Sequence, residues 1–98
     1  MEVERYTNVF DALADTSADA ENLRLRSILI IEISEIVKAW GQSQKDAAKR
    51  LGLTQPRLND LLKGKINNFS IDALVKILDA AGFRVDIRIA SKDHVPSR

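Results

Sequence analysis

Side chains suited to reading DNA bases gather in one short stretch of this 98-residue chain, residues 43–64. The amides of Gln55 and Asn59 can each form two hydrogen bonds with adenine, and the guanidinium of Arg57 can bond guanine or hold a phosphate. These residue types at this spacing favour contact with the major groove of DNA. We therefore expect base contacts from Thr54, Gln55, Arg57, Asn59 and Lys63.

Further polar residues in and just after this stretch suit the phosphate backbone. Gln44 lies at a predicted helix start, where free backbone amides attract anions. A single lysine is ordinarily a solvated surface charge, so only the clustering of lysines around one motif favours a phosphate role. We expect phosphate contacts from Gln44, Lys45, Lys65 and Asn68.

Charge is unevenly distributed along the chain, although the net charge is only +1. Residues 1–36 hold three basic and eight acidic side chains, a net charge of −5. Residues 37–65 hold seven basic and two acidic side chains, a net charge of +5. Because a local positive field attracts phosphate, the middle of the chain is the predicted nucleic-acid surface.

Capping residues predict four helices that position these side chains, each preceded by a hydroxyl side chain and followed by glycine. They cover residues 17–40, 44–51, 55–63 and 71–81, and their caps are Thr16 or Ser17, Ser43, Thr54 and Ser70. At about 100° per residue, the first helix carries one apolar stripe that should face the core. This stripe comprises Leu25, Leu29, Ile33, Ile36, Val37 and Trp40.

The second and third helices resemble a helix-turn-helix of the phage-repressor type. Glutamine, alanine, glycine and two aliphatic residues stand at its expected positions, which here are Gln44, Ala48, Gly52, Leu58 and Leu61. Small residues at the crossing let two helices joined by a tight turn pack closely. Asp60 is ambiguous: it either accepts from a cytosine amino group or, as we favour, braces Arg57 and Lys63.

After the fourth helix, apolar and charged residues alternate with the period of a half-buried strand. The apolar members are Phe83, Val85, Ile87 and Ile89. Because one strand cannot stand alone, we expect it to pair with its own copy in a twofold dimer, with Val85 or Ile87 at the axis. Two alternatives are pairing with the amino arm around residues 3–5 and a dimer formed by helix faces such as Ile28 and Ile31.

The predicted fold is therefore mainly α. It is a four- to five-helix, phage-repressor-like helix-turn-helix domain with one C-terminal β-strand. Residues 1–16 are expected to form a flexible or partner-contacting arm, residues 17–90 the domain, and residues 91–98 a frayed tail.

Three segments of the chain together resemble the HigA-like antitoxins, a family of Xre-class helix-turn-helix regulators. They read NVFDALADTSADAENLRLRS, SQKDAAKRLGLTQPRLNDLLKGK and NNFSIDALVKILDAAGFRVDIRI, and the likeness covers residues 7–89. The resemblance implies the antitoxin of a type II toxin–antitoxin module, which binds a RelE-like messenger-RNA-cleaving toxin and represses its own operon as a dimer. A free-standing Xre-type regulator without a toxin partner is the alternative.

The acidic amino third and its spare apolar side chains suggest where such a toxin would bind. Ile28 and Ile31 fall off the core-facing stripe of the first helix and are either ordinary exposed residues or part of a partner surface. The possible toxin contacts are Val9, Phe10, Leu13, Ile28 and Ile31.

Other kinds of chemistry find little support in the sequence. There is no cysteine, and the only histidine, His94, lies in the tail, so we expect no metal and no cofactor. No nucleophile is placed beside a base, and no phosphate-binding loop is present, so we expect no enzyme.

The most apolar run, residues 28–31, is far shorter than the roughly 20 residues that span a bilayer. We expect a cytoplasmic protein whose partner is double-stranded DNA that contains a palindromic operator.

Overall fold

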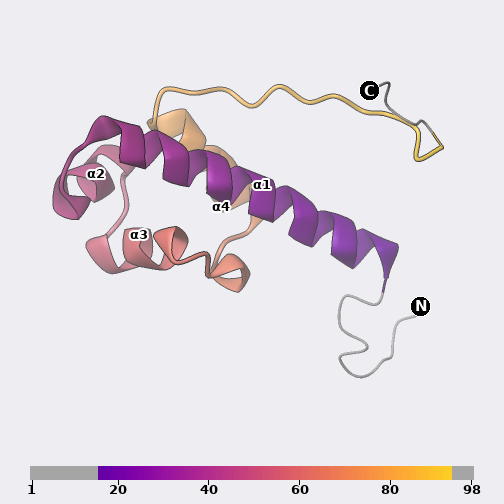
Figure 1. Ribbon diagram of the computed structural model, residues 1–98, viewed down its shortest axis with the longest axis horizontal. Helices are drawn as coiled ribbons and strands as arrows, with labels where there is room; N and C mark the ends of the chain where they lie inside the picture. Colours follow the sequence, from indigo (N-terminus) through magenta and orange to yellow (C-terminus); the bar gives the residue numbers. More distant parts are fainter. Residues whose placement is uncertain (1–15, 94–98) are drawn as a thin grey trace.

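The computed structural model describes residues 16–93, and within that range the chain forms four α-helices and one turn of 3-10 helix (Figure 1). The elements are α1 (Ser17–Trp40), α2 (Gln44–Leu51), α3 (Gln55–Leu62), η1 (Ile66–Asn68) and α4 (Ile71–Ala80). The four predicted helices are confirmed, with α3 and α4 each ending one residue earlier than expected. η1 lies where the sequence suggested only a loop.

Each α-helix begins at a hydroxyl side chain that accepts a hydrogen bond from a backbone amide three residues later. The acceptors are Thr16, Ser43, Thr54 and Ser70, at oxygen–nitrogen distances of 3.0 to 3.2 Å. Such caps satisfy amides that have no partner inside the helix. α1 and α2 end at Gly41 and Gly52, whose φ angles of 65° and 73° are left-handed and favour glycine. Local sequence signals therefore place the helix ends.

α1 is the longest element, and the other helices pack against its carboxyl-terminal half. Ile30, Ile33 and Val37 are its buried residues, and they share a core with α2, α3, α4 and Phe69. In Figure 1 the amino half of α1 extends past α2, α3 and α4. The predicted stripe is therefore wrong at one end: Leu25 is 39% exposed, whereas Ile30, which the stripe omitted, is buried.

The strand predicted over residues 83–89 is wrong for the single chain, because residues 16–93 contain no strand. Alternation predicts a strand, but a strand also needs a neighbour to bond, and this part of the chain supplies none. Val85 packs against the core, whereas Ile87 and Ile89 are 81% and 92% exposed. The segment runs as an extended trace along α1, on the side away from α3 (Figure 1). Near its end, the Lys92 amine donates to the Ser17 hydroxyl at 2.9 Å.

Several predictions fall wholly or partly outside the described residues. The apolar side chains Val9, Phe10 and Leu13 precede residue 16, and His94 follows residue 93. Ile28 and Ile31 lie on α1 and are 42% and 59% exposed, as expected from their position off the stripe.

Two isoleucines on one helix allow a matched test of the core. Ile33 is fully buried and Ile31 is 59% exposed, so their contribution to packing should differ. Ile33→Ala should reduce the free energy of unfolding by about 2–5 kcal/mol, because it leaves a cavity among α1, α3 and α4. Ile31→Ala should change it by less than about 1 kcal/mol. Urea unfolding followed by circular dichroism measures both, and equal midpoints would contradict this packing.

Candidate nucleic-acid interface

The crossing of α2 and α3 is built from small residues and one glycine turn. Ala47 and Ala48 are buried, at 0% and 2% exposed, so the two helices approach closely. Gly52 turns the chain, and the Leu53 amide then donates to the Ala48 carbonyl at 2.8 Å. This pairing satisfies a carbonyl at the end of α2 and fixes the direction in which the chain enters α3.

α3 has one buried face and one open face. Leu58 and Leu61 are fully buried and anchor the helix in the core. Gln55 and Pro56 are exposed and Asn59 is half-buried on the other side. Pro56 lies in the first turn, where its missing amide costs no helical hydrogen bond. α3 therefore presents the amides of Gln55 and Asn59 while its leucines remain packed in the core.

The amino ends of α2 and α3 meet at a shallow depression of about 360 Å³, lined by Gln44, Gln55, Pro56 and Asn59. The structure thus brings a residue predicted to contact phosphate, Gln44, beside two predicted to contact bases. Hydrogen-bonding amides around an open depression suit the edge of a base and its adjacent phosphate.

Arg57 is directed away from this depression and toward η1. Its guanidinium lies 4.3 Å from the centre of the Phe69 ring, and its Nη1 donates to the Asn68 carbonyl at 3.3 Å. Phe69 is itself 1% exposed, so the guanidinium rests on a ring fixed in the core. Arg57 therefore links α3 to the turn that follows it.

Asp60 joins the same connection. Its carboxylate lies 3.4 Å from the Lys65 amine and accepts a hydrogen bond from the Asn68 side-chain amide, also at 3.4 Å. The expectation that Asp60 braces Arg57 and Lys63 is therefore wrong. The sequence offered no sign of these partners, because they meet only after η1 folds the chain back toward α3.

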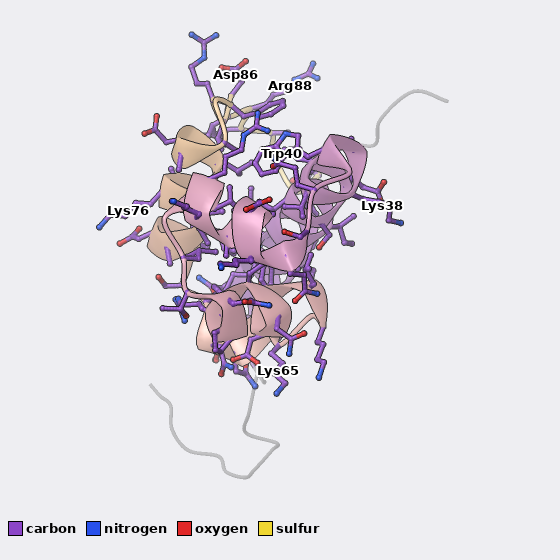
Figure 2. All side chains as sticks on the ribbon, turned by 90° about the vertical axis from the view of Figure 1, so that its left-hand side faces the viewer. Lys38, Trp40, Lys65, Lys76, Asp86 and Arg88 are labelled. Atoms are coloured by element: carbon purple, nitrogen blue, oxygen red, sulfur yellow. The ribbon has the colours of Figure 1, made fainter. Side chains whose placement is uncertain are left out.

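The lysines predicted to contact DNA, Lys63 at bases and Lys45 and Lys65 at phosphates, lie on or beside the two helices. Lys45 lies in the first turn of α2, Lys63 caps the carboxyl end of α3 and Lys65 precedes η1, and all three are exposed. Figure 2 shows Lys65 at the edge of the molecule formed by α3. The side chain of Asn68 is partly engaged by Asp60, so it is less free than the lysines to reach a phosphate.

Two further arginines, not singled out from the sequence, hold the frame around this interface. The Arg26 guanidinium on α1 donates to the Ile66 carbonyl of η1 at 3.0 Å. The Arg50 guanidinium of α2 lies 3.8 Å from the centre of the Trp40 ring at the end of α1. Such cation–π contacts contribute about 0.5–1 kcal/mol at exposed sites.

Residues 16–93 hold no group of three or more histidine, cysteine, aspartate or glutamate side chains placed to bind a metal ion. Over the same residues, no helix is both long and apolar enough to span a membrane.

Comparison with known proteins agrees with this geometry. A family model described as a helix-turn-helix domain matches residues 12–90. A solved structure described as an XRE-family transcriptional regulator is 30% identical, with a TM-score of 0.71, and the match covers 82% of this chain and 90% of that chain. No curated protein matches the sequence. The chain therefore belongs to the helix-turn-helix domain family, as a DNA-binding regulator of the Xre class.

Proposed function

We propose that this regulator is a sequence-specific repressor, which binds a palindromic operator as a homodimer with the amino end of α3 in the major groove. The observation that carries this proposal is the depression lined by Gln44, Gln55 and Asn59. Glutamine and asparagine amides match the donor and acceptor pattern of adenine, so these side chains would select sequence.

The surrounding charges support the same orientation on DNA. Lys45 is exposed in the first turn of α2, Lys63 at the carboxyl end of α3 and Lys65 just before η1. Lysines that neutralise phosphates supply affinity that does not depend on sequence and that weakens as salt rises. A palindromic operator presents two half-sites about 34 Å apart, so a single α3 would read only half of it.

Replacement of Gln55 tests the reading of bases. The operator is first selected from a random DNA library with the wild-type protein. Gln55→Ala should then weaken operator binding by about 1–3 kcal/mol and leave random DNA nearly unaffected. Lys63→Ala should weaken both and reduce the slope of affinity against salt by about one.

Lys76→Ala is the control for loss of charge, because Lys76 lies on α4, at a different edge of the molecule from Lys65 (Figure 2). It should bind operator and random DNA nearly as the wild type does. Fluorescence anisotropy at several salt concentrations measures all three variants. If Gln55→Ala kept the wild-type preference for operator, the proposed docking of α3 would be wrong.

Arg57 allows reading and positioning to be separated. Because its guanidinium lies on Phe69 and bonds the Asn68 carbonyl, we expect it to act by holding η1. Arg57→Ala should lower affinity for operator and random DNA alike, and library selection should return the wild-type consensus. Arg57→Lys should not rescue the loss, because lysine lacks the planar group that stacks. A changed preference at one base would instead assign Arg57 the base contact expected from the sequence.

The resemblance to HigA-like antitoxins supports a finer proposal. Under this finer proposal, the chain is the antitoxin of a type II toxin–antitoxin module, binds a RelE-like toxin and represses its own operon. Ile28 and Ile31 lie exposed on α1 near the exposed carboxylates of Glu32 and Glu35. Apolar side chains beside negative charge suit a cationic, RNA-binding partner. The alternative function is that of a free-standing regulator with no toxin partner.

Copurification with the product of the adjacent reading frame tests the antitoxin role. A tagged chain should retain a small basic protein, and a variant with Ile28→Glu and Ile31→Glu should retain at least about tenfold less, because unpaired charge is costly to bury. Val75→Glu on α4 is the control, since Val75 is similarly exposed at 40%. Deletion of residues 1–15 spares the cap of α1, and it should weaken retention without affecting operator binding. Failure to retain any neighbouring product would favour the free-standing regulator.

A further inference from the structure

Pro56 is the apolar member of the group of residues that line the depression where α2 and α3 meet. The other lining residues, Gln44, Gln55 and Asn59, all end in an amide that donates and accepts hydrogen bonds. Proline has no side-chain donor or acceptor and no backbone amide hydrogen. The depression therefore combines polar groups with a small apolar surface that can make only van der Waals contact.

Pro56 lies near the centre of the open face of α3. At about 100° per residue, Leu58 and Leu61 mark the middle of the buried face, and Pro56 lies about 170° from that middle around the helix axis. On the same measure, Gln55 lies about 90° from the middle of the buried face and Asn59 about 130°. Pro56 is also exposed, so among these lining residues of α3 it faces most directly away from the core.

The first turn of α3, which contains Pro56, is fixed by contacts on its other sides. Leu58 and Leu61 are fully buried, and the Thr54 hydroxyl accepts a hydrogen bond from the Arg57 amide at 3.2 Å. The proline ring has almost no conformational freedom to lose when it is covered. An apolar contact made by Pro56 therefore costs little entropy.

The apolar group that DNA presents in the major groove is the 5-methyl group of thymine. An A·T pair presents this methyl group together with the N6 amino group and N7 of adenine, which a glutamine or asparagine amide can bond. The depression offers amides and an apolar ring side by side. Its composition therefore matches both bases of an A·T pair.

We propose that Pro56 contacts the 5-methyl group of one thymine in each operator half-site and is thereby a specificity-determining residue. The proposal rests on the proposed function, in which α3 enters the major groove, and it names a base by which the operator is selected. The competing role for Pro56 is only to start the helix, because proline is favoured in the first turn. The two roles differ in whether binding depends on one methyl group of the DNA.

Uracil scanning of the operator tests the proposal. Uracil lacks the methyl group of thymine but pairs with adenine in the same way. In the operator selected from the random library, the thymines of one half-site are replaced by uracil one at a time, and binding is measured by fluorescence anisotropy. At one thymine, the replacement should weaken binding of the wild type about fourfold, the effect of losing one buried methyl group.

Pro56→Ser tests whether this effect belongs to the proline ring. The variant should bind the thymine operator and the uracil operator equally, because it has no ring to contact the methyl group. Its binding to random DNA should match that of the wild type, which shows that it is folded. If Pro56 only starts the helix, the variant should instead keep the preference of about fourfold for thymine.

Thr54→Ser is the matched control, because Thr54 also carries a methyl group and directly precedes α3. The serine hydroxyl can still accept the hydrogen bond from the Arg57 amide, so the helix cap remains. Thr54→Ser should keep the preference for thymine over uracil. Loss of the preference in Thr54→Ser, with retention in Pro56→Ser, would assign the methyl contact to Thr54 and overturn the proposal.

5-Methylcytosine distinguishes the two bases that carry this methyl group. At the position found by the scan, the T·A pair is replaced by cytosine or 5-methylcytosine paired with guanine. Both should bind more weakly than thymine, because guanine presents O6 where adenine presents the amino group that an amide bonds. 5-Methylcytosine should bind about fourfold more tightly than cytosine. Tighter binding of 5-methylcytosine than of thymine would overturn the assignment to thymine.

The outcomes also separate this proposal from the proposed function. An operator that tolerates uracil at every thymine refutes the role of Pro56 and leaves the proposed function intact, because sequence would then be selected through hydrogen bonds alone. Failure of the library selection to return any preferred sequence would instead refute the proposed function.

Discussion

The burial of Leu58 and Leu61 is the constraint on which the rest of the molecule depends. α3 has eight residues, and an isolated helix of that length is not stable in water, so its shape and direction come from packing. Both leucines are fully buried in the core that contains Ile33 of α1 and Leu74 of α4. The glycine turn at Gly52 then determines how α2 crosses α3, and therefore where Gln44 lies relative to Gln55.

The polar contacts around α3 have a different role from that of the buried leucines. A buried leucine contributes about 2–5 kcal/mol when compared with alanine, whereas a partly exposed ion pair such as that of Asp60 with Lys65 contributes about 0–1 kcal/mol. The network of Arg57, Asp60, Asn68 and Phe69 is therefore not what keeps α3 in place. It holds η1 and Lys65 beside the helix.

Features encoded close together in the sequence were predictable, and features that depend on distant residues were not. A hydroxyl cap and a following glycine mark a helix locally, so the four helices and the motif between α2 and α3 followed from the sequence. Periodicity predicted which side of α1 is buried, but it could not show how far along α1 the other helices extend. For that reason Leu25 was predicted to face the core although it is exposed. The partners of Arg57 and Asp60 depend on the fold of η1. Alternation over residues 83–89 indicated an extended conformation, but a strand also requires a neighbour.

The division of α3 into an anchored face and an open face also has a consequence for how such a protein can diversify. Gln55 is exposed, whereas Leu58 and Leu61 are fully buried, so replacement of Gln55 leaves the core intact. Exposed substitutions of this kind usually alter stability by no more than about 0.5 kcal/mol. With α3 docked as proposed, duplicated copies of the gene can therefore drift toward different binding sites through changes at a few surface positions, while the same scaffold is inherited unchanged.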